Sequence, residues 1–279
     1  MIIGCAAQQG TQGYNLGRLT ATAAGLPNSV PGMTLDRQCS SGLMSIGFAA
    51  QNIMLGSMDI VVAGGVESIS MVQNKHKNTY RNISKKVLSH SEHAYMQMIE
   101  TAEVVAKRYN ISRLAQDEYS LQSQLRIAAA QKNNLFDNEI VPMASTKSVF
   151  NRETKEVTFE DVLLAKDEGN RPSTTLESLQ SLEPVWKDGR VISQGEFITA
   201  GNASQLSDGA SACVVMDSQL AAQKGLAPMG VFRGMAVAGC EPDEMGIGPV
   251  YAIPKLLKQH GLSIDDIGLW EINEAFACQ

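Results

Sequence analysis

The sequence lacks the short motifs that mark several common functions. Its five cysteines stand alone, without a CxxC pair or a cysteine–histidine cluster, which excludes a zinc site of the usual spacing and favours a reducing compartment. Neither a GxGxxG nor a Walker A motif occurs, which excludes the two common nucleotide-binding fingerprints. We expect a protein with no bound metal and no permanently bound cofactor.

Long apolar runs are also missing. The longest charge-free stretch, residues 38–58, contains glutamine, asparagine, serine and glycine, which favours a buried helix over a membrane span. The N-terminus has no basic segment followed by an apolar core, so it does not resemble a signal peptide. We therefore expect no membrane association and a cytoplasmic location.

Aromatic residues are few, at 5% of 279 residues, but hydrophobic residues reach 44% and charged residues 19%. These proportions are typical of a folded globular protein and exclude a disordered chain. The formal net charge of −6 gives no general attraction for nucleic acid.

Charge is distributed unevenly along the chain. Residues 1–72 contain five charged side chains, residues 73–190 contain 33, and residues 191–279 contain 14. A segment with so little charge stays soluble when both sides of its elements are covered, as in a layered α/β core. We therefore predict that residues 73–190 form a surface excursion from a core built by both ends of the chain.

The N-terminal segment alternates between two kinds of element. Short apolar runs predict strands at residues 2–3, 33–35 and 59–65, and helical spacing predicts helices at residues 14–24 and after Cys39. Strand, helix and strand at such short distances imply a parallel sheet.

The rest of the chain is less regular. Ser112 is a reasonable N-cap for a helix to about residue 132, and one helical turn is expected at residues 176–182 within an irregular stretch from 145 to 195. The remaining expected elements are a buried strand at residues 208–216, strands at residues 227–236 and 268–272, and a helix at residues 249–260.

Cys39 is the first candidate for chemistry. It follows an apolar strand and precedes a helix, where unpaired backbone N–H groups and the positive dipole end favour a thiolate. Small residues after it, Ser40, Ser41 and Gly42, leave room for a substrate and for a backbone N–H to hold an oxyanion. The alternative is that Cys39 is a small apolar filler of the core.

Two polar segments are further candidates. Asn273 follows an expected strand, and the carboxyl ends of strands are where ligands bind in α/β sheets; its alternative role is a turn or cap residue. Residues 199–212 are rich in small polar residues, which suit either a ligand-binding loop or an ordinary tight connection. Met98, Met245 and Phe276 can line an apolar pocket, although methionine is more often core filler.

Five ordered motifs, DRQCSSGL, VVAGGVES, TAGNASQLSDGA, EPDEMGIGP and NEAFA, resemble those of the thiolase family, at thiolase-like spacing over the whole chain. The resemblance implies an α/β protein with a layered αβαβα fold of two similar halves. It places the N-terminal half at residues 1–72 and 191–220, an inserted loop domain that covers coenzyme A at 73–190, and the start of the C-terminal half at 221–279.

The resemblance also implies an acetyl-CoA C-acyltransferase, in which Cys39 attacks the keto carbon of a 3-ketoacyl-CoA, releases acetyl-CoA and passes the shortened acyl group to a second coenzyme A. Asn273 resembles the asparagine that fixes a water in the oxyanion site. Other implied contacts to coenzyme A or acyl group are Arg171, Ser178, Ser204, Met98, Met245 and Phe276. Family members form dimers or tetramers, so a homo-oligomer is expected.

The sequence departs from the family in three places. The GHP and CxGGGxG segments that follow NEAFA in thiolases do not occur, and the chain begins at what resembles the second strand, so we expect that this polypeptide alone does not run the full reaction. At one position biosynthetic thiolases tend to have His-Met-Gly and degradative thiolases Pro-Met-Gly, but here the residues are Gln97, Met98 and Ile99. Both acetoacetyl-CoA synthesis and 3-ketoacyl-CoA cleavage therefore stay open, and we favour cleavage. The remaining alternatives are a fragment that binds coenzyme A without turnover and a fragment that does not fold alone.

Overall fold

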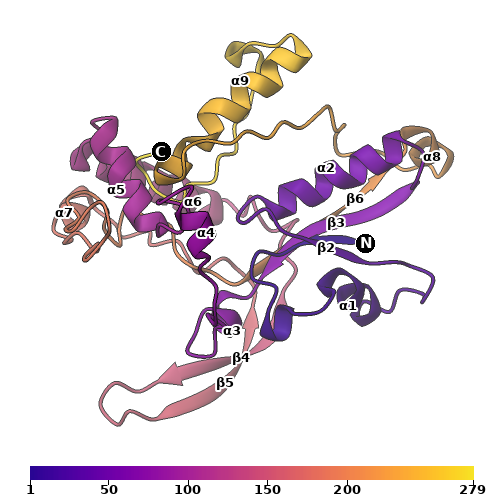
Figure 1. Cartoon of the computed structure of the whole chain (residues 1–279). Coiled ribbons are helices and arrows are strands. Elements are labelled where there is room, and N and C mark those ends of the chain that lie inside the picture. The colour runs from indigo at the N-terminus through magenta and orange to yellow at the C-terminus, as the bar shows by residue number, and fades with distance from the viewer. The chain divides into compact units, whose positions relative to one another are not determined.

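The computed structural model describes residues 1–279, which form two compact units (Figure 1). Unit 1 contains residues 1–90, 206–239 and 248–269, and unit 2 contains residues 91–205, 240–247 and 270–279. Each unit therefore gathers segments that are distant in sequence. No helix of either unit is both long enough and apolar enough to cross a membrane.

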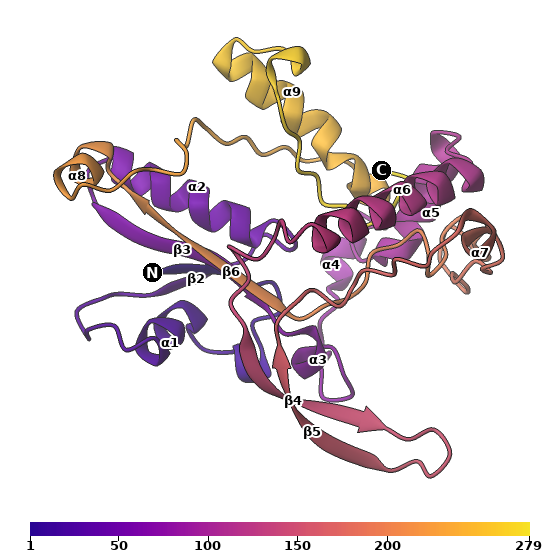
Figure 2. The ribbon, with the colours of Figure 1, turned by 180° about the vertical axis from the view of Figure 1, so that it is seen from behind.

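Unit 1 is built on a four-stranded sheet. Strands β1 (Ile2–Gly4), β2 (Met33–Leu35) and β3 (Ile60–Glu67) run parallel, and β6 (Gly209–Met216) pairs antiparallel with β3, in the order β2-β1-β3-β6. Helix α2 (Ser41–Met54) lies along the sheet (Figure 2). The core between them contains Ile2, Ala49, Val61 and Ala63.

The other elements of unit 1 are short helices with recognisable ends. They are η1 (Gly10–Gln12), α1 (Leu16–Ala23), α3 (Ile69–Val72), α4 (Lys85–Leu88), α8 (Ser218–Gln223), α9 (Gly248–His260) and η3 (Ile264–Asp266). The Asn15 side chain accepts a hydrogen bond from the Arg18 N–H at the start of α1, and Gly261 adopts a left-handed φ of 65° directly after α9. These are ordinary capping devices, and they explain why the expected helices at 14–24 and 249–260 form.

Three glycines let the first turn of α2 approach the sheet backbone. A Cβ atom on Gly4 would overlap the backbone of Ser41 and Gly42, and one on Gly65 would lie 3.1 Å from the Gly42 Cα. The Ser45 hydroxyl, further along the helix, donates to the Gly64 carbonyl at 2.8 Å. The N-terminal end of α2 is thus fixed directly against the main chain of β1 and β3.

Unit 2 is organised around a helix that is buried over most of its length. Helix α5 (Met98–Arg108) buries every residue from Glu100 to Ala106. Its Glu100 carboxylate accepts hydrogen bonds from the Val191 and Ile192 N–H groups, and its Glu103 carboxylate accepts from the N–H groups of residues 196–198. Two buried carboxylates therefore satisfy the backbone of residues 191–198, which has no regular secondary structure.

The other elements of unit 2 are α6 (Arg113–Lys132), β4 (Met143–Phe150), β5 (Val157–Leu164), α7 (Leu176–Gln180) and η2 (Pro242–Ile247). Strands β4 and β5 form an antiparallel hairpin. The apolar core of the unit joins α5 to distant segments and consists of Ala102, Val105, Ala106, Ile198, Ile247, Phe276 and Cys278.

The mixed α/β fold and the parallel arrangement of the first strands agree with the sequence prediction. Four local predictions are wrong. Residues 227–236 and 268–272 form no strand, because nothing in the chain pairs with them. The stretch 145–195, expected to be irregular, holds most of the β4–β5 hairpin, whose strands are exposed on both faces and therefore show no alternating pattern. Strand β6, expected to be buried, is largely exposed, because it lies at the edge of the sheet.

The packing of α2 on the sheet predicts the effect of a single methyl group. We expect Gly4→Ala to lower the free energy of unfolding by about 3 kcal/mol, because the new Cβ collides with backbone that cannot rotate away. The control is Gly209→Ala in β6, where a Cβ meets nothing within 4 Å; it should change stability by less than about 0.5 kcal/mol. Urea unfolding of both variants measures the difference, and equal stabilities would contradict the close contact.

Candidate active site

Cys39 lies in unit 1, in the turn between β2 and α2, and its side chain is exposed. The turn is built by local hydrogen bonds. The Ser41 hydroxyl accepts from the Arg37 N–H at 2.8 Å and donates to the Gln38 carbonyl at 2.6 Å, while Gln38 adopts a left-handed φ of 49°. The exposed sulfur therefore stands immediately before the N-cap of α2, where backbone N–H groups lack intrahelical acceptors.

The carboxyl ends of β1 and β3 are joined by Glu67. Its carboxylate accepts hydrogen bonds from the Ala6 N–H at 2.8 Å and from Gln12 Nε2 at 2.6 Å. Cys5 Sγ lies 3.7 Å from Glu67 Oε1, and burial together with this negative charge raises the pKa of Cys5 to about 11. Cys5 is thus a buried, neutral thiol that differs from the exposed Cys39.

Unit 2 contains a cleft of about 990 Å³. Four residues expected at the site from the sequence line it together: Arg171, Ser178, Ser204 and Asn273. They come from the segment before α7, from α7 itself, from the polar loop at 199–212 and from the C-terminal NEAFA segment. Residues separated by about a hundred positions in the sequence therefore share one cavity.

The polar loop and the NEAFA segment are brought together by backbone pairing. The Ser204 N–H donates to the Ala275 carbonyl at 2.9 Å, and the Ala277 N–H donates to the Asn202 carbonyl at 2.9 Å. Ala203 and Phe276 form the antiparallel bridge between these bonds. This short ladder places Ser204 and Asn273 on the same wall of the cleft.

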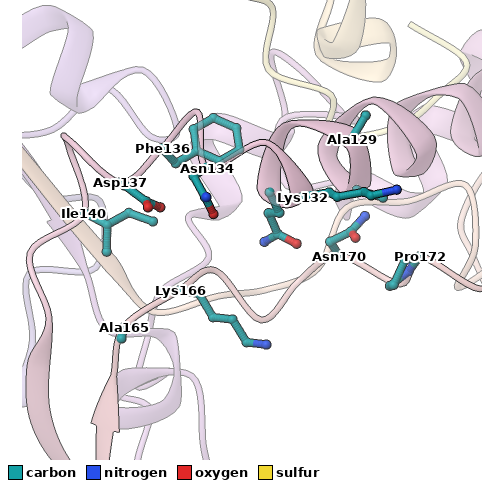
Figure 3. Close-up of a pocket in the computed structure, with 12 residues that line it drawn as sticks. Ala129, Lys132, Asn134, Phe136, Asp137, Ile140, Ala165, Lys166, Asn170 and Pro172 are labelled. Carbon is teal, nitrogen blue, oxygen red and sulfur yellow. The ribbon is translucent and has the colours of Figure 1, made fainter.

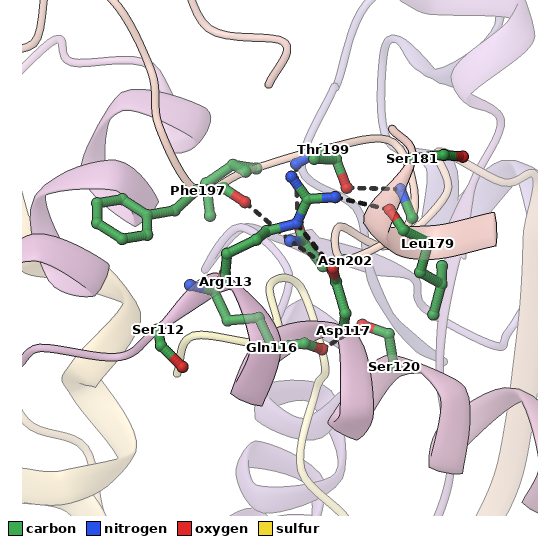
Figure 4. Close-up of polar contacts among 12 residues, drawn as sticks. Ser112, Arg113, Gln116, Asp117, Ser120, Leu179, Ser181, Phe197, Thr199 and Asn202 are labelled. Carbon is green, nitrogen blue, oxygen red and sulfur yellow. Dashed lines mark hydrogen bonds and ion pairs between the residues drawn. The ribbon is translucent and has the colours of Figure 1, made fainter. Parts of the chain in front are cut away.

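A buried polar network holds the loop that carries Ser204 (Figure 4). Asp117 on α6 is fully buried and accepts from Arg113 Nε at 3.0 and 2.9 Å on its two oxygens. Asn202 Nδ2 donates to Asp117 and to the Phe197 carbonyl, and its Oδ1 accepts from the Thr199 N–H at 2.8 Å. The Asn202 amide therefore ties the loop to α6 with all its hydrogen-bonding groups in use.

The three expected apolar pocket residues lie elsewhere in unit 2. The Phe276 side chain is buried in the unit's apolar core, and Met98 and Met245 are 38% and 41% exposed at the start of α5 and in η2. None of them lines the cleft. Cys39 belongs to unit 1 and Asn273 to unit 2, so the expected pairing of these two residues stays a prediction.

The segment that carries Met245 is attached to α5 by charge. Arg108 at the end of α5 donates to Asp243 at 2.5 Å and to Glu244 at 2.6 Å, and Tyr109 donates to the same Glu244 oxygen at 2.9 Å. The hydrogen bond from Arg108 is the main reason that the pKa of Asp243 is lowered. These contacts hold residues 241–247 against α5 within unit 2.

Sequence reasoning missed several cleft residues on α6, above all Tyr119, Ser123, Gln124 and Arg126. Tyr119 and Ser123 donate to the Glu274 carboxylate at 2.7 and 2.6 Å, and the hydrogen bond to Glu274 raises the pKa of Tyr119. Tyr119 and Ser123 are four residues apart in the predicted helix and therefore share a face, which is the signal that could have suggested them.

In residues 1–279, no three histidine, cysteine, aspartate or glutamate side chains gather closely enough to hold a metal ion.

The environments of the cysteines predict an order of chemical modification. Burial raises the pKa of both Cys5 and Cys278 to about 11, well above neutral pH, so both remain neutral thiols, whereas Cys39 is exposed. Iodoacetamide should therefore alkylate Cys39 well before Cys5 and Cys278, as followed by peptide mass spectrometry over time. In urea, where these environments are lost, the three cysteines should be alkylated at similar rates. Similar rates in the native protein would contradict the environments described here for Cys5 and Cys278.

Comparison with known proteins agrees with this geometry. The family model described as "Thiolase, N-terminal domain" matches residues 1–219, and "Thiolase, C-terminal domain" matches residues 226–279. The chain is 45% identical to the 3-ketoacyl-CoA thiolase of Bacillus subtilis, covering 100% of this chain and 69% of the relative. The chain thus spans 69% of the length of this relative, and 54% of the length of the peroxisomal 3-ketoacyl CoA thiolase 1 of Petunia hybrida.

Solved structures give the same result. The dimeric peroxisomal thiolase of Saccharomyces cerevisiae matches with a TM-score of 0.83 and 34% identity, over 99% of this chain and 66% of that one. Human mitochondrial 3-ketoacyl-CoA thiolase in complex with CoA matches with a TM-score of 0.80 and 36% identity, over 99% and 68%. The thiolase-like fold predicted from the five motifs is thereby confirmed, and the chain belongs to the thiolase family.

Proposed function

We propose that the protein acts as a thiolase-type acyltransferase, which cleaves 3-ketoacyl-CoA to acetyl-CoA and a shortened acyl-CoA through an acyl-enzyme on Cys39. The observation that carries the proposal is the cleft of unit 2, because it gathers Arg171, Ser178, Ser204 and Asn273 around one cavity. The names of the relatives, among them 3-ketoacyl-CoA thiolase at 45% identity, support the same reaction.

The cleft suits coenzyme A, which carries charged phosphate groups and a long arm with both polar and apolar parts. Arg171 and Arg126 supply positive charge, and guanidinium groups bind phosphate by paired hydrogen bonds. Ser178 and Ser204 offer hydroxyl groups, while Leu179 and Trp270 give apolar surface. The solved complex of the human relative with CoA supports coenzyme A as the ligand.

The proposed chemistry begins at Cys39. Its sulfur attacks the keto carbon of the substrate and forms a thioester, while the bond between that carbon and the α-carbon breaks. The electron pair of this bond stays on the acetyl-CoA carbanion, which takes up one proton in exchange for the proton that the Cys39 thiol gives up. The thiol of a second coenzyme A then attacks the thioester carbonyl and forms the shortened acyl-CoA, while its proton goes to Cys39, which leaves as a free thiol.

Two features of the chain would stabilise the charges that develop. Backbone N–H groups at the N-terminus of α2 can hold the oxyanion formed on the attacked carbonyl. The Asn273 amide, which does not titrate, can orient a water that holds the enolate oxygen of acetyl-CoA. Met98, Met245 and Phe276 are proposed to contact the acyl group or coenzyme A on family grounds.

The wider setting is also a proposal. We place the N-terminal half at residues 1–72 and 191–220, the coenzyme A loop domain at residues 73–190 and the C-terminal half from residue 221. A homo-oligomer is supported by the dimeric yeast relative. The name 3-ketoacyl-CoA thiolase, which several relatives carry, favours 3-ketoacyl-CoA cleavage, as in fatty acid β-oxidation, over acetoacetyl-CoA synthesis. A cytoplasmic location and the lack of a permanently bound cofactor are proposed from the sequence alone.

The acyl-enzyme provides the direct test of the nucleophile. Incubation with a 3-ketoacyl-CoA and rapid acid quenching should add one acyl group to the peptide that contains Cys39, and Cys39→Ala should abolish this mass shift. The control is Cys213→Ala, which alters another exposed cysteine of unit 1 and should keep the acyl-enzyme. An acyl group that persists in the Cys39→Ala protein would contradict the assignment.

The role of the cleft is tested separately by binding. Arg171→Ala should weaken coenzyme A binding by about 10- to 100-fold, because a charge-assisted phosphate contact contributes about 1.5 to 3 kcal/mol. Arg126→Ala should act in the same direction, whereas Arg152→Ala, in the exposed β4–β5 turn, should leave the dissociation constant unchanged. Calorimetry with coenzyme A measures all three, and an unaltered constant for Arg171→Ala would reject the assignment.

A further inference from the structure

Helix α6 is held in place on either side of the residues that line the cleft. Near its start, Arg113 Nη2 donates to the Leu179 carbonyl at 2.6 Å. Near its end, Gln131 Nε2 donates to the Asp167 carbonyl at 2.9 Å. The cleft residues between these two anchors, Tyr119 among them, therefore form a fixed wall.

A second cavity, of about 570 Å³, lies beside the C-terminal end of the same helix (Figure 3). Its lining on α6 begins at Ala128 and includes Lys132, and it shares no residue with the cleft. Tyr119 and Ser123 therefore border the cleft alone, and any role of their hydroxyl groups concerns that site.

The C-terminal segment that carries Asn273 is held by backbone hydrogen bonds only from Ala275 onward. The Ala275 carbonyl accepts from the Ser204 N–H, and the Ala277 N–H donates to the Asn202 carbonyl. Residues 268–273, in contrast, have no regular secondary structure and make no backbone hydrogen bond. The ladder therefore ends just before the residue whose amide the proposed chemistry uses.

Glu274 supplies an anchor at this point. Its Oε1 accepts from the Tyr119 hydroxyl at 2.7 Å, and its Oε2 accepts from the Ser123 hydroxyl at 2.6 Å. Each carboxylate oxygen has a donor of its own, and hydrogen bonds to a charged acceptor are about twice as strong as neutral ones. The chain next to Asn273 is thereby tied to the fixed wall of the cleft.

We propose that Glu274 is the positioning residue for Asn273, because its two hydrogen bonds to α6 set where the neighbouring amide stands in the cleft. The inference rests on the reaction proposed above, in which the Asn273 amide orients the water that holds the enolate oxygen of acetyl-CoA. Adjacent Cα atoms are about 3.8 Å apart, so a carboxylate held on α6 leaves the Asn273 backbone little freedom. A displacement of about 1 Å at a reacting site can lower a rate about 100-fold.

Backbone dynamics test the placement without any turnover. In the full 279-residue chain, the ¹⁵N order parameter of the Asn273 N–H should be near 0.85, the value of about rigid backbone, and should fall below about 0.6 in Glu274→Ala. The Ala277 N–H, which the ladder holds, should stay rigid in both proteins and is the internal control. A flexible Asn273 in the unaltered chain, or an equally rigid one in Glu274→Ala, would overturn the proposal.

Single-turnover formation of the acyl-enzyme tests the consequence for the reaction. Glu274→Ala should lower the limiting rate by at least about 10-fold, while the dissociation constant of coenzyme A, measured by calorimetry, should change by less than about twofold. Glu274→Gln keeps one acceptor oxygen and should recover part of the rate. The control is Glu118→Ala, which removes an exposed carboxylate of α6 outside the cleft and should leave the rate unchanged. Equal losses of affinity and rate in Glu274→Ala would overturn the proposal.

Removal of the two donors completes the test. Tyr119→Phe combined with Ser123→Ala should lower the rate as much as Glu274→Ala, and adding Glu274→Ala to this pair should have little further effect, because the same contacts are already lost. Fully additive losses would overturn the proposal. An unaltered chain that forms no acyl-enzyme would count only against the reaction proposed above, since the order parameter of Asn273 still decides the placement.

Discussion

The buried amide of Asn202 is the interaction on which the second unit depends. It contacts Asp117 on α6 and the backbone at residues 197 and 199, and the residues that follow it pair with the NEAFA segment. Because Asp117 is fully buried, its charge requires both Arg113 and the Asn202 amide. One polar side chain thereby connects the helix, the polar loop and the C-terminal segment that together line the cleft.

Local chemistry made some elements predictable from the sequence. The Ser112 cap and the length of α6 follow from capping preference and apolar spacing, and the turn at α7 follows from its Thr175 capping box. The strands expected at residues 227–236 and 268–272 have suitable composition, but a strand also needs a partner, and partners are a property of the whole fold. Hydrophobic patterning alone therefore predicts strands even in segments that have no partner strand to pair with.

The candidate site was predictable only in part. Arg171, Ser178, Ser204 and Asn273 came from family motifs, and the structure gathers them in one cleft. Phe276 is buried in the apolar core of unit 2, and its contact with the acyl group stays a prediction. Tyr119 and Arg126 line the cleft but belong to no sequence motif. A helix face with one charged and one hydroxyl side chain looks, in the sequence, like any solvent-exposed surface, so nothing marked them as site residues.

The three glycines beneath α2 also determine what can move the sulfur of Cys39. At Gly4, Gly42 and Gly65 the backbone of α2 touches the backbone of the sheet, so main-chain atoms set the distance between the helix and the sheet. Side chains deeper in the interface, such as Ile46 and Ile53, can change in size and shift the far end of the helix. The backbone contact at the Cys39 end of the helix does not depend on the size of those side chains.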